Sequence, residues 1–353
     1  MTFEQARALF PVLERIAYLN AGTFGPLPRP VVDAQSAGLA RDLAEGRTGL
    51  PYFEETIAQR DELRGAFASL VGAAPESVAL TTSTSEGCAI VVRGLGLGRG
   101  DEIVTTTDEH FGLLGPVGAS GATVVVVPPE PEQILAAITP RTKLVATSQV
   151  LWTTGAVLPL AELRARTAVP VLADGAQSVG AIPSTARGVD FLTISGQKWL
   201  CGPDSTGALV VADSERLRVT SPSYFAQTAH EPDGTFTPRP GARRFESGWW
   251  SAGALGGMLA ALELRPAWCH ERAAGAASRC RALLEPRVEV VTPAVASTLV
   301  AFRPEEKPSE VVERLHAAGV HVRELPGRGL VRVSCGWWTS DDDLDRLVAA
   351  LEA

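Results

Sequence analysis

Short runs of aliphatic and β-branched residues alternate with stretches rich in Ala, Leu, Arg and Glu along most of the chain. The runs predict strands over residues 77–82, 101–106, 122–128, 142–148, 170–174, 189–195 and 207–213. The stretches between them, such as 131–138 and 159–167, have helical spacing. Continuous apolar strands separated by helices predict an α/β fold, in which helices cover both faces of a mostly parallel sheet.

The pattern changes near residue 285, where shorter strands and helices follow one another in an α+β order. Strands are expected at 288–293, 297–304, 320–325 and 330–336, and helices at 308–319 and 340–352. The first twenty residues have the composition of a mixed helix, and 253–268 that of a helical connection. We therefore expect a segment over 1–17 that packs with the small domain, a large domain over 18–262 and a small C-terminal domain over 263–353.

The overall charge and the cysteines exclude several classes of function. The 353 residues include 32 Lys and Arg against 40 Asp and Glu, a net charge of -8, and no long run of like charge. A nucleic-acid-binding protein needs a concentrated basic face, and a membrane span needs roughly 18 apolar residues in a row. The five cysteines lack the spacing of a metal site. We expect a cytoplasmic protein with free thiols and with no metal, nucleic-acid or membrane partner.

Polar residues stand where several predicted strands end, the edge at which such sheets bind ligands. Thr84 and Ser85 lie between a strand and a helix, so they can either bind an anion such as phosphate at the helix N-terminus or simply cap the helix. His110 also follows a strand, where its ring can stack on a flat ligand, move a proton or start a helix.

Two further strand ends carry charged residues. Asp174 ends a buried strand in "VLADGAQSVG", where a carboxylate needs a cationic partner such as a protonated pyridine nitrogen. A Mg²⁺ ion would also satisfy it, but no second carboxylate cluster supports a metal. Gln177 could hydrogen-bond a phenolic oxygen on the same ring. Lys198 follows the apolar run "DFLTIS", and its amine is either a nucleophile or that of an ordinary loop lysine.

Pyridoxal 5'-phosphate (PLP) requires all four of these features together. Its phosphate needs an anion site, its ring a stacking partner, its ring nitrogen a carboxylate and its aldehyde a lysine amine. We therefore interpret Lys198 as the lysine that bonds to the cofactor, with Asp174 and His110 as its catalytic neighbours.

With these residues in place, the chain resembles the class V aminotransferase group of fold-type I PLP enzymes. This group contains the cysteine desulfurases, the selenocysteine lyases, the cystine C–S lyase and isopenicillin N epimerase. The likeness extends from "YLNAGTFGPLP" to "LVRVSCGWWTSDDDLDRLVAAL", with "VLADGAQSVG" and "SGQKWLCGP" at matching separation. It implies a PLP-dependent enzyme that acts on an amino acid and works as a homodimer.

The resemblance also assigns roles to individual residues. Cofactor contacts are implied for Thr84, Ser85, His110, Gln149, Asp174, Gln177, Ser195, Gln197 and Lys198. Substrate contacts are implied for Asn20, Ala21, Gly22, Arg323 and Arg332. Within this set, Arg332 matches the arginine that grips the substrate α-carboxylate.

Two departures from the family pattern are evident. Cysteine desulfurases carry a mobile cysteine shortly before the carboxylate arginine, but no cysteine lies between His321 and Arg332 here. Trp249 stands where the family has a threonine that reaches the phosphate from the neighbouring subunit, so it would take that place beside the cofactor or shape the pocket.

The absent cysteine favours a C–S lyase that acts by β-elimination on L-cystine or L-cysteine. The cystine C–S lyase, the closest in style, has a second arginine nine positions before the first, and Arg323 stands there. A solvated surface arginine is the alternative for Arg323. The alternatives for the reaction are an epimerase of the isopenicillin N type, a desulfurase or an aminotransferase, and a scaffold without cofactor is the non-enzymatic one.

Overall fold

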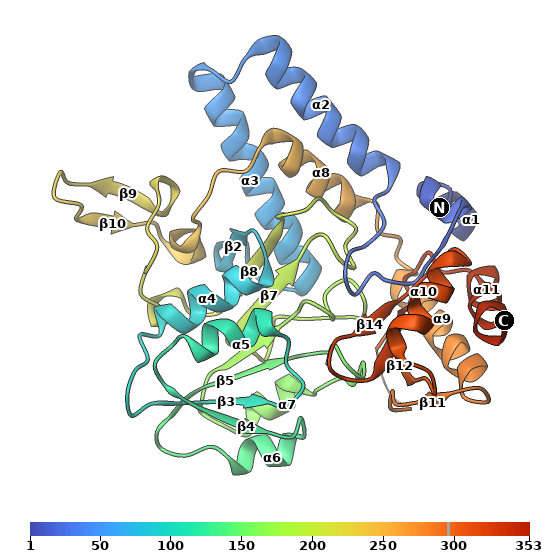
Figure 1. Cartoon of the computed structure of the whole chain (residues 1–353). Helices are drawn as coiled ribbons and strands as arrows, with labels where there is room; N and C mark the ends of the chain where they lie inside the picture. The colour runs from blue at the N-terminus through green and yellow to red at the C-terminus, as the bar shows by residue number, and fades with distance from the viewer. Residues whose placement is uncertain (295–296) are drawn as a thin grey trace.

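A seven-stranded sheet forms the centre of the molecule (Figure 1), whose computed structural model describes residues 1–294 and 297–353. In spatial order its strands are β2 (Val78–Thr81), β8 (Gly207–Val211), β7 (Phe191–Ser195), β6 (Val171–Asp174), β5 (Thr142–Ser148), β3 (Glu102–Thr106) and β4 (Thr123–Val127). Only β8 runs antiparallel to its neighbours. The prediction of an α/β fold with a mostly parallel sheet is confirmed, and every strand lies within its expected run.

Helices cover both faces of this sheet, as the alternation along the strands requires. They are α2 (Arg29–Glu45), α3 (Gly49–Val71), α4 (Thr84–Gly94), α5 (Phe111–Gly118), α6 (Pro131–Ala136), α7 (Leu160–Ala165) and α8 (Ala252–Glu263). Neighbouring strand residues point into different cores. Val104 packs in the core that contains residues of α3, α6, α7 and α8, whereas Ile103 packs with residues of α4 and α5.

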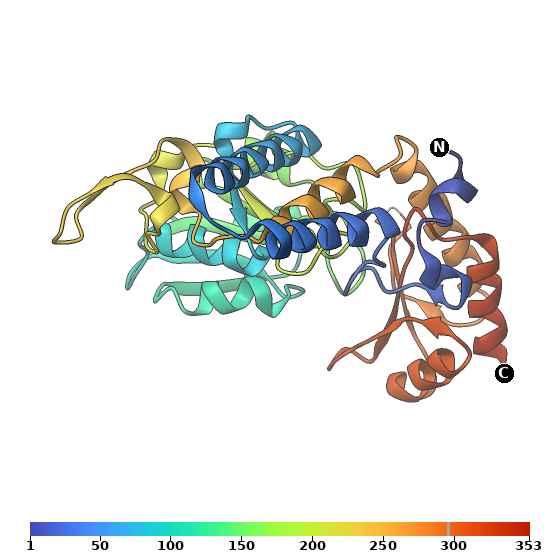
Figure 2. The same ribbon diagram turned by 90° about the horizontal axis from the view of Figure 1, so that it is seen from above.

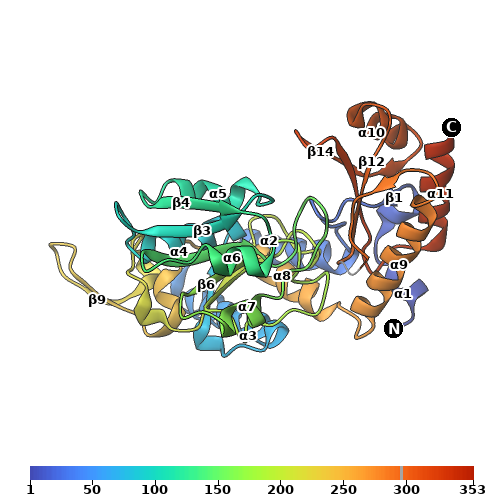
Figure 3. The same ribbon diagram turned by 90° about the horizontal axis from the view of Figure 1, so that it is seen from below.

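A smaller four-stranded sheet lies at one end of the molecule, together with the C-terminal helices (Figure 3). Its order is β11 (Glu289–Val290), β12 (Leu299–Arg303), β15 (Leu330–Ser334) and β14 (Arg323–Leu325). Helices α9 (Cys269–Leu284), α10 (Pro308–Ala317) and α11 (Asp341–Glu352) share its core. Because Val331 and Val333 point into that core, Arg332 between them lies on the opposite face of the sheet.

The first residues of the chain join this small sheet region rather than the large one. Instead of the single mixed helix that we expected, the segment contains α1 (Phe3–Arg7), a 3₁₀ turn η1 (Pro11–Glu14) and β1 (Ala17–Tyr18). Pro11 lacks the N–H that would continue a helix. Strand β1 pairs in parallel with β13 (Val320–His321). Arg7 anchors α1 through hydrogen bonds to the Asp343 carboxylate and the Trp338 carbonyl.

A hairpin of β9 (Gln227–His230) and β10 (Phe236–Pro238) projects from the far end of the large domain (Figure 2). The remaining short turns are η2 (Pro75–Ser77), η3 (Ser214–Arg216), η4 (Tyr224–Ala226) and η5 (Gly241–Phe245). None of the helices in the described part of the chain is both long and apolar enough to cross a lipid bilayer.

Candidate active site

Five strand ends bring most of the predicted cofactor residues to one edge of the large sheet. In chain order these are Thr84 and Ser85 after β2, His110 after β3, Gln149 after β5, Asp174 at the end of β6, and Ser195, Gln197 and Lys198 at and after β7. Strands β2, β3, β5, β6 and β7 run in the same direction, so their carboxyl ends meet at this edge.

Lys198 lies half-buried at the centre of this edge. Burial lowers the pKa of its amine from 10.5 to about 8, and the positive charges of Arg332 and Arg323 act in the same direction, while Asp174 opposes them. A lysine with a pKa near 8 has a substantial uncharged fraction near neutral pH, as a nucleophile or a base requires.

Asp174 is 3% exposed and has a partly satisfied carboxylate. Its Oδ1 accepts hydrogen bonds from the backbone N–H of Ala176 at 2.9 Å and from Thr193 Oγ1 at 3.2 Å. Thr193 stands opposite Asp174 on the neighbouring strand β7. Since both bonds end on Oδ1, Oδ2 is the oxygen that can accept from a protonated pyridine nitrogen.

His110 caps the N-terminus of α5, which confirms the alternative that it starts a helix. Its Nδ1 accepts from the Gly112 N–H at 3.0 Å, which leaves the proton of the neutral ring on Nε2. Burial and then the charge of Lys198 lower its pKa, so the neutral ring is favoured. A Cβ on Gly112 would lie 2.6 Å from Ser85 Oγ and 3.2 Å from His110 Nδ1, so the glycine keeps this corner open.

The first turn of α4 contains the two residues of the predicted anion site, Thr84 and Ser85. The residue that caps α4 is Ser83, whose Oγ accepts from the Glu86 N–H at 3.1 Å, so Thr84 and Ser85 lie inside the first turn. On the other side of the edge, Ser195 Oγ donates to Gln197 Oε1 at 2.8 Å. The phosphate role of these hydroxyl and amide groups stays a prediction, and the helix N-terminus favours an anion there.

The two glutamines differ in how their amides are engaged. Gln177 donates from Nε2 to the Gly22 carbonyl at 2.8 Å and accepts from the indole N–H of Trp199 at 3.0 Å. Its second N–H remains for a ring oxygen, and its bonds also hold the Gly22 segment in place. Gln149 Oε1 is buried and has no hydrogen-bond partner among the described residues.

Arg323 and Arg332 stand directly opposite each other on β14 and β15, so their side chains lie on the same face. Arg332 is 1% exposed, and burial together with Arg323 lowers its pKa to about 9. Within the described chain neither guanidinium has an ion pair with a carboxylate: Arg332 Nη1 donates to the Trp152 carbonyl and Arg323 Nη1 to Thr23 Oγ1. Two opposed like charges are unfavourable, so this arrangement calls for an anionic ligand.

The segment of Asn20, Ala21 and Gly22 runs beside these arginines. Asn20 forms a parallel bridge with Ser334, and its Oδ1 accepts from Thr23 Oγ1 at 2.8 Å. Ala21 is fully buried. A Cβ on Gly22 would lie 2.6 Å from Arg332 Nη2, so glycine is needed to keep room for the guanidinium.

Trp249 lies in an aromatic cluster with Tyr52, Phe53 and Phe225, with ring centroids 5.0–6.4 Å apart. It also lines a cavity of about 420 Å³, in which Thr82 is the residue nearest in sequence to the predicted anion site. The aromatic cluster accommodates the large Trp249 ring at the position where the family has a small threonine. Its contact with the cofactor stays a prediction.

Sequence reasoning missed Glu109, which the fold makes the best-satisfied acid of this region. Its carboxylate is 3% exposed and accepts from Thr106 Oγ1, Thr147 Oγ1 and both the N–H and Oγ of Ser148. Burial raises its pKa in spite of these bonds. Glu109 thus links the ends of β3 and β5 next to His110. The signal in the sequence that could have pointed to this role is an acidic residue at the end of a predicted strand.

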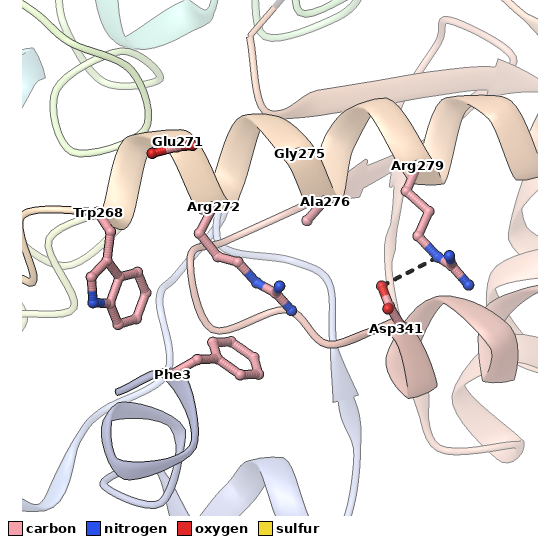
Figure 4. A pocket seen from close by; sticks show the side chains of 8 residues that line it. All are labelled: Phe3, Trp268, Glu271, Arg272, Gly275, Ala276, Arg279 and Asp341. Atoms are coloured by element: carbon pink, nitrogen blue, oxygen red, sulfur yellow. Dashed lines mark ion pairs between the residues drawn. The ribbon is translucent and has the colours of Figure 1, made fainter. Parts of the chain in front are cut away.

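A cavity of about 580 Å³ lies apart from this edge, between α1, α9 and α11 (Figure 4). Phe3, Trp268, Glu271, Arg272, Gly275, Ala276, Arg279 and Asp341 line it. The Arg272 guanidinium lies over the Phe3 ring at 4.0 Å, and Arg279 pairs with Asp341 at 3.2 Å. None of the predicted site residues takes part in it.

The residues at the sheet edge fit PLP: Lys198 offers an amine with a lowered pKa, Asp174 a carboxylate oxygen with no hydrogen bond in the described structure, and His110 a neutral ring. Fold and site together define a PLP-dependent enzyme of fold type I. The class V aminotransferase family model matches residues 17–347, and the chain belongs to this family.

Relatives with different reactions resemble the chain. It is 29% identical to isopenicillin N epimerase of Streptomyces clavuligerus, over 99% of this chain and 98% of the relative. It is 32% identical to a cysteine desulfurase of Klebsiella pneumoniae strain 342, over 74% of this chain and 72% of the relative. Among solved structures, the complex of the cystine C–S lyase C-DES with its product cysteine persulfide has a TM-score of 0.90 and 28% identity, over 97% of this chain and 98% of the other.

Proposed function

We propose that this protein is a C–S lyase that acts by β-elimination on L-cystine, and more weakly on L-cysteine. The products from cystine are pyruvate, ammonia and cysteine persulfide, and from cysteine pyruvate, ammonia and sulfide. The observation that carries the proposal is the pair Arg323 and Arg332, which face the site of Lys198 without a carboxylate partner in the described chain.

The two arginines match a substrate with two amino-acid ends. Arg332 is buried and can bind the α-carboxylate of the half that reacts, because a guanidinium offers two parallel N–H groups to a carboxylate. Arg323 is half-buried on the neighbouring strand and can bind the carboxylate of the distal half. A disulfide-linked substrate such as cystine has both carboxylates, whereas cysteine has one.

The segment between the arginines also argues against a sulfur-accepting thiol. It contains no cysteine, and its tip is tied to the large domain: Arg328 donates to the Thr107 carbonyl at 3.1 Å and pairs with Asp108 at 3.3 Å. Cys335 is fully buried, and its hydrogen bond with Cys280 and its burial raise its pKa well above the ordinary value. A protonated, enclosed thiol is a poor nucleophile.

Each residue of the site has a separate role in the proposed elimination. PLP, when bound, supplies an electron sink that makes the Cα–H bond of the substrate acidic. Arg332 holds the carboxylate so that this bond points at Lys198. The Lys198 amine accepts the α-proton, Asp174 Oδ2 would hold a proton on the ring nitrogen of PLP, and His110 would stack against the ring. Loss of the sulfur from Cβ leaves an enamine, which water converts to pyruvate and ammonia.

The similarity to the cystine C–S lyase C-DES supports this reading, since that protein is named for the same cleavage. Epimerisation is a second candidate, because the similarity to isopenicillin N epimerase covers nearly the whole of both chains. An epimerase would return the α-proton on the opposite face of the ring instead of releasing sulfur.

The test is to incubate the purified holoenzyme with L-cystine, L-cysteine and L-alanine, and to assay pyruvate, sulfide, L-alanine and D-amino acids together. Pyruvate from cystine supports elimination. A D-amino acid as the main product would favour the epimerase. Release of L-alanine from cysteine that is lost in Cys335→Ser would restore the desulfurase.

Arg323→Ala tests the second carboxylate site. We expect it to weaken the use of cystine more than that of cysteine, by about 1–3 kcal/mol in kcat/KM. Arg303→Ala is the matched control, because Arg303 lies on the same small sheet but is exposed and pairs with Glu289. Equal losses for the two substrates in Arg323→Ala would contradict the two-carboxylate argument.

We also propose that the protein is a cytoplasmic homodimer. Val32, Leu39 and Leu43 lie on one face of α2 and are 44–89% exposed, with Leu50 of α3 close by in sequence at 65%. An apolar face of this kind is expected to be covered by a second copy in a family that builds its site at a subunit interface. Light scattering that shows a fully active monomer would contradict this.

A further inference from the structure

Trp152 connects two parts of the site that lie on different sheets. Its backbone carbonyl accepts a hydrogen bond from Arg332 Nη1 at 2.9 Å. Its indole ring meets the His110 ring edge-on, with centroids 5.3 Å apart and an angle of 84° between the planes. Trp152 therefore borders the space between the carboxylate arginine and the ring-stacking histidine.

The indole N–H of Trp152 is buried and has no acceptor among the described residues. Buried donors without a partner are rare in folded proteins because the lost hydrogen bond to water is not replaced. An indole nitrogen can only donate. A ligand that accepts a hydrogen bond would satisfy it.

Arg332 carries a second buried hydrogen-bond donor that has no acceptor among the described residues. Its Nη1 is used by the Trp152 carbonyl, while its Nε is buried and has no partner in the described structure. Gly22 lets the guanidinium pack closely against its backbone, because a Cβ there would lie 2.6 Å from Nη2. A carboxylate only accepts hydrogen bonds and suits the Nε and Nη2 edge of a guanidinium. One carboxylate can thus satisfy the donors of both residues.

The turn that carries Trp152 is held firmly against the small sheet. Val150 and Val157 close the turn by an antiparallel bridge. The Gly155 carbonyl accepts from the Ser297 N–H at 3.0 Å, and a Cβ on Gly155 would lie 2.8 Å from the Leu299 carbonyl oxygen. A donor on a fixed turn is positioned before the ligand arrives, which favours binding.

We propose that Trp152 is a specificity-determining residue whose indole N–H acts together with Arg332 in binding the carboxylate of the substrate. The inference rests on the proposed function only in that the substrate is an amino acid, and it is independent of the reaction that follows.

Trp152→Phe tests the inference, because phenylalanine keeps a flat ring beside His110 but has no N–H. Binding of L-alanine and of ethylamine to the holoenzyme is measured by the change in coenzyme absorbance. Ethylamine has the amine and the methyl group of alanine without the carboxylate, and neither compound has a leaving group. We expect Trp152→Phe to weaken alanine binding about tenfold and to leave ethylamine binding unchanged.

Trp337→Phe is the matched control, since the Trp337 indole N–H is also buried and has no acceptor among the described residues, but packs among Phe10, Trp268 and Trp338. It should change neither affinity. Equal weakening of the binding of both ligands in Trp152→Phe, or of neither, would overturn the inference.

If the Trp152→Phe variant does not fold, the test uses the unaltered protein and follows the NMR signal of the Trp152 indole N–H. This signal must shift when alanine is added and must not shift when ethylamine is added. If cystine gives no pyruvate but alanine binding alone still weakens, the proposed reaction fails and the role of Trp152 stands.

Discussion

The low pKa of Lys198 leads to a measurable pH dependence of cofactor attachment. Only the uncharged amine can attack the aldehyde of PLP. A fall in pKa from 10.5 to about 8 changes the uncharged fraction at pH 7 by 10 to the power 2.5, or about 300-fold. The rate at which the apoenzyme takes up PLP should therefore rise about tenfold per pH unit below 8 and level off above it.

The assay removes the coenzyme, adds PLP back between pH 6 and 10, and follows the absorbance of the protein-bound form. The reaction of PLP with free N-acetyl-lysine in the same buffers corrects for the pH dependence of PLP itself. Lys198→Ala should show no borohydride-reducible adduct. A corrected rate that keeps rising to pH 10 would refute the reasoning, because it would mean that the amine is not perturbed.

The charges near Lys198 predict the direction in which substitutions should shift its pKa, and this direction can be measured. Arg332→Gln removes a positive charge that disfavours the ammonium form, so the plateau should move to higher pH. Asp174→Asn removes a negative charge that favours the ammonium form, so the plateau should move to lower pH. Shifts in the opposite directions would contradict the arrangement of charges around Lys198.

Three further changes test other parts of the site. Asp174→Ala should leave coenzyme bound but lower kcat by several orders of magnitude, as measured by pyruvate release, because the ring nitrogen loses the group that holds its proton. Glu109→Gln should lower the free energy of unfolding by about 2 kcal/mol and alter the circular dichroism of bound coenzyme, since one of the two oxygens that accept from donors of β3 and β5 is replaced by an NH2 group. Arg328→Ala should raise KM with little change in kcat, because it frees the hairpin tip held by Asp108; unchanged steady-state kinetics would show that this contact is dispensable.

The sequence was sufficient for the large domain because its signals are local. A buried strand between two helical layers is a short apolar run, and every such run proved to be a strand of the central sheet. The residues at the strand ends then had to meet at one edge, which is why His110, Asp174 and Lys198 could be grouped without coordinates. Pro11 is the local signal in the first segment that argues against a single helix, since the 3₁₀ turn begins at this residue.

The contacts that depend on register between distant strands could not be predicted. Arg323 and Arg332 are opposite each other only because β14 and β15 pair in one particular register. Two of the three residues that donate to Glu109, Thr147 and Ser148, come from the end of β5, about forty residues away. Trp152 has no sequence signal of a role, because the lack of an acceptor for its N–H among the described residues depends on how the turn packs against the small sheet.

The pairing of β1 with β13 has a consequence for how the protein folds during its synthesis on the ribosome. Residues 17–18 leave the ribosome about 300 residues before their partner strand, residues 320–321. The Gly22 segment, which contacts Gln177 and Arg332, is thus anchored only after this long stretch has been added. Closing so long a loop is slow, and the large sheet can form meanwhile. A nascent chain that has not reached residue 320 can therefore form the sheet edge around Lys198 but not the substrate-binding face around Arg332, so that catalytic competence follows the folding of the large sheet.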